Sequence, residues 1–328
     1  MNIYDIAKKA GVSASTVSRV INNKPGVRLK TRKKVKQLLT EYNYSPNETA
    51  RGLVNKASKI IGILVDDIRN IHHTDGAYII ERELEKLGYC CIILNTGTDE
   101  ASKAEYIKIL KSRRVEGAVL IGSSFQSKAV EEAIQKNLND LPVLMANGYL
   151  DLPNVYGVLA DEKDGVANCV NLLYEKGHKH PAFVIDLYTP SNKLKRQGFE
   201  EAVQSYALDE EPLVYETERT LNGAYDVTKR IINEHPDVDG IVYAIDLLAT
   251  AGIRALIDMG ITIPSQVAVI GVDNSIYAEI CNPKLTSLDN KLLNLSTTAA
   301  HNLINALNGG QPNKKVLIFS SIVERETT

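Results

Sequence analysis

An alternation of short apolar runs with amphipathic helical segments extends through residues 59–323, and few folds can satisfy it. The run Lys59–Val65 is apolar, short and bounded by polar loops, which is typical of a buried parallel strand. Further strands are predicted near 89–95, 117–121, 143–146, 181–185, 213–215, 240–244 and 267–271, with a last strand over Val316–Val323. Helices are predicted near 75–87, 102–113, 126–137, 164–176, 194–206, 223–234, 246–259 and 291–308. Repeated βα units predict parallel sheets that helices cover on both faces.

The length of the chain allows more than one such sheet. A chain of 328 residues is expected to form two to three domains. The roughly 270 residues from Lys59 onward are enough for two doubly wound lobes. Right-handed βαβ packing places ligand-binding groups at the carboxyl ends of the strands, so we expect these ends to face a cleft between the lobes.

The stretch Asn2–Asn22 predicts two short helices joined by a tight turn. Within Ile3–Ala10, apolar residues recur at i, i+3, i+4 and i+7, which is one face of a helix. Gly11 tolerates the left-handed backbone that ends a helix abruptly. Ser13 can cap a second helix through its side-chain oxygen.

The second helix has two contrasting faces. Val17, Val20 and Ile21 form the apolar one, whereas small hydroxyls, an arginine and an amide project from the other. These polar residues are Ser15, Ser18, Arg19 and Asn22. Hydroxyls and amides donate to phosphates, and arginine can bridge both acceptors of a guanine edge. The pattern therefore predicts a helix-turn-helix whose second helix reads a DNA groove.

A third amphipathic helix argues against the alternative, a small helical hairpin that only packs. Its apolar face comprises Val35, Leu38, Leu39 and Tyr42, which would close a three-helix core. Residues 1–59 hold 13 Lys/Arg and 3 Asp/Glu, a net charge of +10, whereas the remainder has a net charge of −12. The basic segment therefore suits a polyanion. A membrane surface is a less suitable partner, because the core uses all the apolar positions of this segment.

Several classes of protein and site find no support in the sequence. The N-terminus enters a capped helix at once and no run approaches about 18 apolar residues, so we expect neither a signal peptide nor a membrane span, and a cytoplasmic location. The four cysteines show no metal spacing, and the adjacent Cys90 and Cys91 are poorly placed for a disulfide, which predicts buried free thiols. We find no nucleophile elbow, P-loop, dinucleotide fingerprint or zinc signature, and the adjacent carboxylates Asp66 and Asp67 would diverge from a strand end. We therefore expect no enzyme activity, no cofactor and no metal.

The N-terminal segment resembles a known family. Its motifs Asp5–Ala7, Ala10–Ser13 and Ser15–Asn22 are similar, nearly without gaps, to the head of the lactose-repressor/galactose-repressor (LacI/GalR) transcription factors. The resemblance extends more loosely over the whole chain. It implies a small all-α helix-turn-helix head (residues 1–45), a hinge (46–58) and an α/β periplasmic-binding-protein-like body of two doubly wound lobes (59–328). Lobe 1 would span about 59–160 and 290–319, and lobe 2 about 161–289 and 320–328.

The hinge carries a second match, because Tyr44–Asn47 and Ala50–Leu53 resemble the hinge of that family. A two-turn helix over Asn47–Val54 would be marginal alone. In the family it pairs with its twin in the minor groove, where a leucine at the position of Leu53 kinks the DNA. The alternative is a flexible tether, with Leu53 packed against the body.

The resemblance assigns roles on DNA. Ala14, Ser15 and Arg19 match base-reading positions, and Ala14 can offer only apolar contact, for example to a thymine methyl. The remaining residues are expected mainly at phosphates. The predicted DNA-binding set is Ser13, Ala14, Ser15, Thr16, Ser18, Arg19, Asn22, Tyr44, Asn47, Ala50 and Leu53.

The loops that follow the body strands supply the predicted effector site. His72 and His73 stand where the family usually has aromatic residues, and imidazoles can cover a sugar face and donate hydrogen bonds. The alternative there, a metal site, rests on two adjacent histidines alone. Lys195, three residues before a glycine, takes the place of a basic effector-binding residue, and Ile245-Asp246 stands where Asn-Asp is common. The predicted set is Asn70, His72, His73, Ser123, Asp161, Lys195, Asp246 and Asp273.

Asp273 is the most favoured effector-binding residue. The segment Gly271–Asn274 is close to the Gly-x-Asp-Asn motif of the family, and a carboxylate can accept from two neighbouring sugar hydroxyls. A helix cap or a salt bridge between the lobes is the alternative role.

Together these observations predict a cytoplasmic transcriptional regulator, a repressor of LacI/GalR type. Two chains would bind a pseudo-palindromic operator as a homodimer, and a sugar, phosphosugar or nucleoside-like effector would bias the lobe arrangement. The resemblance also allows a protein co-regulator that docks on the body. A sugar-binding protein with a vestigial head is the second hypothesis, and the intact polar face of the second helix argues against it.

Overall fold

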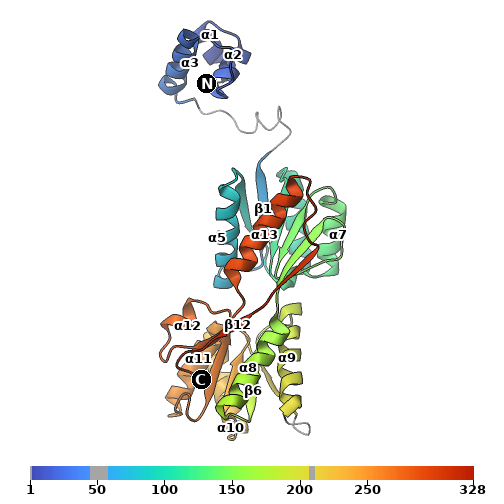
Figure 1. Cartoon of the computed structure of the whole chain (residues 1–328), viewed down its shortest axis with the longest axis vertical. Helices are drawn as coiled ribbons and strands as arrows, with labels where there is room; N and C mark the ends of the chain where they lie inside the picture. The colour runs from blue at the N-terminus through green and yellow to red at the C-terminus, as the bar shows by residue number, and fades with distance from the viewer. Residues whose placement is uncertain (1, 45–57, 207–210) are drawn as a thin grey trace. The chain divides into compact units, whose positions relative to one another are not determined.

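The computed structural model describes residues 2–44, 58–206 and 211–328 (Figure 1). The chain forms two compact units, Met1–Ser58 and Lys59–Thr328. The predicted hinge helix and its residues Asn47, Ala50 and Leu53 lie outside the described residues. The head and the body are therefore considered one at a time.

The described part of the head, residues 2–44, contains three helices, α1 (Ile3–Ala10), α2 (Ala14–Ile21) and α3 (Leu29–Glu41). Both predicted helix ends are confirmed. Gly11 ends α1 in the left-handed conformation at φ 70°, and the Ser13 hydroxyl accepts a hydrogen bond from the Thr16 amide as the cap of α2. At the start of α1, the side chain of Asn2 caps the helix while Asp5 accepts from the Asn2 amide. Each short helix is thus delimited by its own sequence.

A small core holds these helices together. Its fully buried members come from all three helices and are Ile6, Ala7, Ala10, Val17, Val20 and Val35. Leu38 and Leu39 pack against them, but the prediction for Tyr42 is wrong. Tyr42 follows the end of α3 and is exposed, and its hydroxyl accepts a hydrogen bond from the Lys9 ammonium at 3.0 Å. It joins α3 to α1 from outside the core.

Lobe 1 of the body is built on a six-stranded parallel sheet of order β11-β5-β4-β3-β1-β2. Its strands are β1 (Ile60–Val65), β2 (Cys90–Asn95), β3 (Gly117–Ile121), β4 (Val143–Ala146), β5 (Val155–Ala160) and β11 (Lys315–Ile318). Helices α5 (Ile71–Glu85) and α13 (Leu292–Leu307) share one hydrophobic cluster with the sheet, and α6 (Glu100–Ser112) and α7 (Lys128–Asn137) share another. A short 3-10 turn, η1 (Ser123–Phe125), follows β3.

Lobe 2 repeats this plan with a sheet of order β12-β10-β9-β8-β6-β7. Its strands are β6 (Pro181–Ile185), β7 (Leu213–Glu216), β8 (Gly240–Tyr243), β9 (Ala268–Val272), β10 (Thr286–Asp289) and β12 (Ser321–Val323), and only β12 is antiparallel to its neighbour. Helices α8 (Glu162–Lys176) and α9 (Pro190–Tyr206) pack with one cluster, and α10 (Leu221–Glu234) and α11 (Asp246–Asp258) with another. A short helix, α12 (Ile276–Ile280), follows β9.

The chain passes between the two sheets three times, after β5, after β10 and between β11 and β12 (Figure 1). The predicted fold class is confirmed. One element differs, because the single strand predicted over Val316–Val323 is two strands in different sheets. Strands β5 and β10 and helix α12 were not predicted.

Two further observations concern membrane-spanning helices and the cysteines. Among the described residues, no helix is both long and apolar enough to cross a membrane. All four cysteines are free, but burial differs from our prediction, since Cys169 is buried and Cys90 is exposed.

Candidate functional site

Helix α2 presents a polar surface in the head. Val17 and Val20 are buried beneath it, whereas Ser15, Arg19 and Asn22 are exposed. The alternation follows from the 3.6-residue period of the helix, since the residues between the apolar anchors must face outward. Ser13, Ala14, Thr16 and Ser18 flank this surface at its amino end and side.

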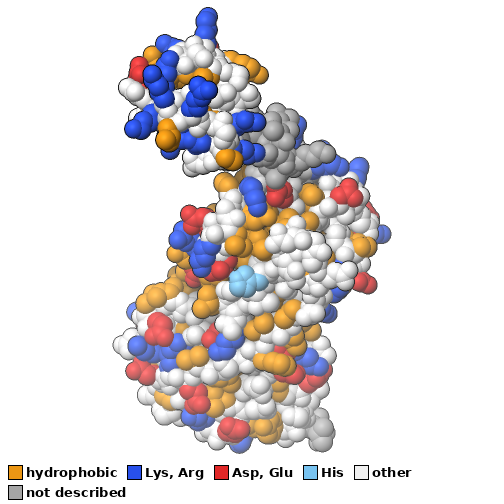
Figure 2. All heavy atoms as spheres, turned by 45° about the horizontal axis from the view of Figure 1, so that its top comes forward, with side chains coloured by type: hydrophobic (Ala, Val, Ile, Leu, Met, Phe, Trp, Pro, Cys, Tyr) orange, Lys and Arg blue, Asp and Glu red, His pale blue; other side chains and the backbone are white. Residues whose placement is uncertain are grey.

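Hydrogen bonds orient the small polar side chains of α2. The Ser13 hydroxyl lies 2.8 Å from that of Ser15 and 2.9 Å from that of Thr16. The Asn22 amide donates to the Ser18 carbonyl at 2.9 Å. Figure 2 shows Lys and Arg side chains spread over the visible face of the head, while both signs of charge are mixed on the body. The polar surface of α2 therefore belongs to a positively charged unit, as a DNA-binding surface requires.

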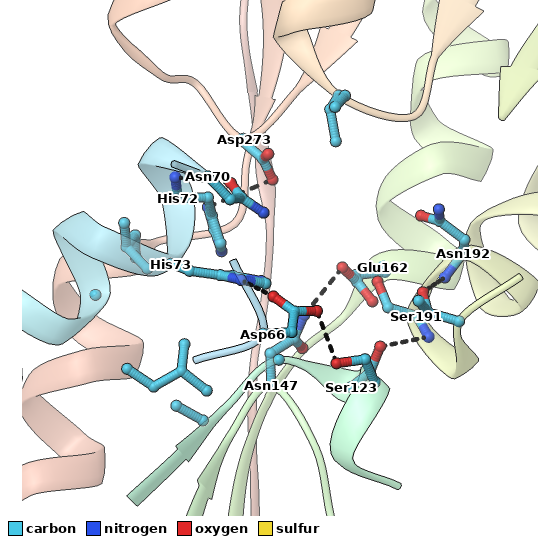
Figure 3. Close-up of a pocket in the computed structure, with 18 of the residues that line it drawn as sticks. Asp66, Asn70, His72, His73, Ser123, Asn147, Glu162, Ser191, Asn192 and Asp273 are labelled. Atoms are coloured by element: carbon cyan, nitrogen blue, oxygen red, sulfur yellow. Dashed lines mark hydrogen bonds and ion pairs between the residues drawn. The ribbon is translucent and has the colours of Figure 1, made fainter. Parts of the chain in front are cut away.

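The body holds a small cavity between its lobes, at the carboxyl ends of the strands (Figure 3). Its volume is about 60 Å³, which is room for roughly four water molecules. Two larger spaces, of about 340 and 330 Å³, reach His72 and Asp273 from outside. Six of the eight predicted effector-binding residues line this cavity, and they come from both lobes. The residues of the predicted set that line it are Asn70, His72, His73, Ser123, Lys195 and Asp273.

Asp66 anchors the lobe 1 side of the cavity. It follows β1 directly and is buried, and its carboxylate lies 2.8 Å from Nδ1 of His73 and accepts from the Ser124 hydroxyl at 2.8 Å. Burial alone would raise the pKa of Asp66, but the hydrogen bonds from His73 and Ser124 and the nearby Lys103 ammonium lower it to about 2. Asp67 turns away to pair with Arg69 at 2.7 Å, so the two adjacent carboxylates diverge.

His72 and Asp273 meet across the cleft. Nδ1 of His72, at the start of α5, lies 3.5 Å from Oδ1 of Asp273, which follows β9 in the other lobe (Figure 3). Burial lowers the pKa of His72, and the carboxylate of Asp273 opposes that shift. Asp273 has a φ of 107°, a region that disfavours side chains, and its amide donates to the Leu288 carbonyl at 2.9 Å. A backbone held in such a conformation is typical of functional sites.

Lys195 is buried in lobe 2. Its ammonium donates to the Ala244 carbonyl at 3.0 Å and lies 3.6 Å from Glu162, which in turn accepts from the Asn147 amide at 3.2 Å. Close packing of α9 on α8 makes this possible, because a Cβ at Gly198 would fall 2.0 Å from the Lys163 carbonyl oxygen. The glycine three residues after Lys195 is thus a packing requirement of the site.

Two predicted residues do not line the cavity. Asp161 lies at the crossing that leads into α8. Asp246 borders an outer space but is buried, and its carboxylate accepts from the hydroxyls of Ser275 and Ser287 at 2.8 and 2.6 Å. Burial and the nearby Asp273 carboxylate raise the pKa of Asp246 to about 7. The hydrogen bonds of Asp246 link α11 to β10 and to the start of α12 rather than reaching into the cleft.

The structure also adds residues to the predicted site. Asp66, Asn147, Glu162, Asn192 and Arg219 all line the cavity. Asp66 and Asn147 directly follow β1 and β4, so the strand-end criterion could have found them. Glu162 and Arg219 could be identified as site residues only from the three-dimensional arrangement of the strands and of the crossings between the lobes. Among the described residues, no group of three or more His, Cys, Asp and Glu could hold a metal ion.

Comparisons with known proteins agree with both the helix-turn-helix head and the two-lobed body. Residues 2–47 match the family described as bacterial regulatory proteins, lacI family, and residues 170–328 match a periplasmic binding protein-like domain. An HTH-type transcriptional regulator from Lachnoclostridium phytofermentans is 34% identical over 331 residues, which covers 100% of this chain and 99% of that protein.

Two solved structures are similar in fold. The Lac repressor dimer bound to operator and an anti-inducer has a TM-score of 0.90 at 23% identity, with 100% of this chain and 98% of that chain covered. A periplasmic binding protein/LacI transcriptional regulator from Alkaliphilus metalliredigens, complexed with D-xylulofuranose, has a TM-score of 0.69 at 26% identity, with 82% of this chain and 99% of that chain covered.

Proposed function

Because the chain belongs to the lacI family of bacterial regulatory proteins, with a helix-turn-helix head that makes it a DNA-binding transcriptional regulator, we propose that it is a repressor controlled by a sugar or sugar derivative. Two chains bind a pseudo-palindromic operator as a homodimer, with α2 of each chain in the major groove. The observation that carries this proposal is the exposed polar surface of α2 over a buried apolar one.

The cleft supports effector control. Its lining side chains come from both lobes, and the contacts that cross it include His72 to Asp273, the Ser191 amide to the Ser123 hydroxyl at 3.1 Å, and the Asn147 amide to the Glu162 carboxylate at 3.2 Å. A small molecule that enters must replace or reinforce these contacts, so it favours one lobe arrangement over another. Such a change is coupled to DNA binding when the two arrangements differ in affinity for the operator. The solved relative with D-xylulofuranose supports a sugar-sized effector for this chain.

The test is a selection from random DNA. The purified full chain is incubated with a pool of random palindromic duplexes, and the retained DNA is sequenced, with and without a mixture of sugars. We expect enrichment of one symmetric site, and an affinity for that site that falls steeply as salt rises.

Control measurements separate the parts of the proposal. Salt-sensitive binding with no enriched site in either condition would contradict sequence-specific recognition. An enriched site whose binding is unchanged by every sugar would contradict effector control by sugars while leaving operator binding intact.

A further inference from the structure

Both cations that line the inner cavity are neutralised by carboxylates of the protein. The Lys195 ammonium is 4% exposed, lies 3.6 Å from Glu162 and also donates to a backbone carbonyl. The Arg219 guanidinium donates to Asp186, whose side chain is completely buried and also accepts from the Asn192 amide at 2.9 Å. An anionic ligand could pair with either cation only by displacing the carboxylate that already pairs with it, which would leave that carboxylate buried without a partner.

In the two outer spaces, too, the cations are paired with carboxylates of the protein. The Arg69 guanidinium pairs with Asp67 at 2.7 Å in one space, and the Lys291 ammonium pairs with Asp289 at 2.8 Å in the other. Among the described residues, the lysine and arginine side chains that line these spaces are therefore already paired with carboxylates of the protein.

Two helix amino ends at the cavity, those of α5 and α9, are also occupied; helix amino ends are the other usual type of anion site. At the start of α5 the Asn70 side chain accepts from the His72 amide at 3.1 Å. At the start of α9 the Ser191 amide donates to the Ser123 hydroxyl of the opposite lobe. These amides are engaged within the protein.

Carboxylates, by contrast, are in excess. Asp273 lines all three spaces, and among the described residues no lysine or arginine pairs with it; its contacts are His72 at 3.5 Å and the Asn290 amide at 3.3 Å. Asp75 adds a further carboxylate in one outer space. A carboxylate without a cation repels phosphate and accepts hydrogen bonds from hydroxyls.

We propose that the cleft takes an uncharged sugar and rejects the phosphate ester of the same sugar, with Asp273 and the Lys195–Glu162 pair as the specificity determinants. This inference rests on the proposed function of the cleft as an effector site. The inner cavity is bounded by the His72–Asp273 contact and by the Ser123–Ser191 contact, so a ligand there lies against side chains of both lobes.

The experiment uses matched pairs of ligands. Binding of ribose, fructose and glucose to the full chain is measured by calorimetry beside ribose 5-phosphate, fructose 6-phosphate and glucose 6-phosphate, with inorganic phosphate as a further probe. We expect at least one free sugar to bind and its ester to bind about tenfold or more weakly.

Two variants test the cause of the discrimination. Asp273→Asn removes the uncompensated charge, and Glu162→Gln releases the Lys195 ammonium. Each should reduce the ratio of free-sugar to ester affinity by about tenfold, and Glu162→Gln should do so mainly through tighter ester binding. Asp140→Asn makes the same charge change at an exposed site of lobe 1 and should leave the ratio unchanged.

The outcomes are distinguishable. An ester that binds as tightly as its free sugar, or a ratio that neither variant changes, overturns this inference and leaves the proposed function standing. If no member of the panel binds, the inference is also wrong, and the operator selection decides separately on the proposed function.

Discussion

At the scale of single residues, Arg19 is the side chain on which discrimination among DNA sequences should depend most. It is exposed on α2, between the buried Val17 and Val20 in sequence, and its guanidinium can bridge two acceptors of one base. We expect Arg19→Ala to weaken operator binding by roughly 1–3 kcal/mol and to bring it close to the affinity for scrambled DNA.

Lys33, exposed on α3, provides the control for Arg19. Lys33→Ala should weaken binding to operator and scrambled DNA alike, because a lysine at a phosphate carries no base information. Competition titrations of both variants against the two duplexes measure the difference. Undiminished preference of Arg19→Ala for the operator would show that other side chains read the bases.

Asp66 makes a prediction about pH. Its pKa is about 2 in the folded chain and near 3.9 in an unfolded one, so the ionised form is stabilised by folding. Because the pKa is lower in the folded chain, ionised Asp66 adds about 2 kcal/mol to the free energy of unfolding above pH 4, and this contribution is lost as the pH falls toward 2. Asp66→Asn should therefore lower the free energy of unfolding of the body by about 2 kcal/mol at pH 7, and by less at pH 3.

Urea unfolding of wild type and variant at the two pH values checks this expectation. Asp140→Asn, an exposed carboxylate change in the same lobe, should have little effect at either pH. Equal losses for Asp66→Asn at pH 7 and pH 3 would mean that packing, rather than the charge of Asp66, is what the substitution removes.

At the scale of elements, the turn between α1 and α2 depends on one backbone conformation. Gly11 has a φ of 70°, and a Cβ built on it would meet nothing within 4 Å. The cost of a side chain there is thus conformational and not steric. We expect Gly11→Ala to destabilise the head by about 1 kcal/mol and Gly11→Asn by less, since asparagine tolerates this region.

Amide hydrogen exchange in α1, α2 and α3 measures this change in the full chain. The body provides an internal reference, because its exchange should be the same in both variants and the wild type. Equal exchange for alanine and asparagine variants would show that the left-handed backbone is not what limits the substitution.

The sequence predicts these elements unevenly, for physical reasons. The ends of α1 and α2 are encoded locally by Gly11 and Ser13, and both were predicted. Strand β5 carries Gly157 in its middle and β10 is the short polar run Thr286–Asp289, so neither shows the apolar pattern of a buried strand. The division of Val316–Val323 into two strands depends on which sheet each half joins, which no local pattern records.

The residues of the cleft, too, could be predicted from the sequence only in part. Strand-end loops led to His72, His73 and Asp273, which do line the cavity. Asp246 also follows a strand, yet it is buried against Ser275 and Ser287, because its direction depends on contacts among three elements. Spacing identifies which residues lie near a strand end, but only packing decides which of them face the ligand.

At the scale of the whole molecule, the three crossings between the lobes allow the body to change arrangement without unfolding. The His72–Asp273 contact joins the lobes directly, and the groups that face His72 there are Asp273, His73, Lys195 and Glu162. Burial between the lobes lowers the pKa of His72 in this arrangement. Protonation of His72 therefore favours arrangements in which the imidazole is more exposed.

The expected result is that the lobes separate as the pH falls from 8 to 5.5, through the range in which an exposed histidine gains its proton. Small-angle X-ray scattering of the full chain should show a larger radius of gyration at pH 5.5 for the wild type. His72→Gln keeps a hydrogen-bond donor for Asp273 but does not titrate, so its radius should change less. The contribution of the head is common to both proteins and cancels in the comparison. The same increase in both would show that another group controls the lobes, and an unchanged wild type would show that the His72–Asp273 contact tolerates the charged imidazole.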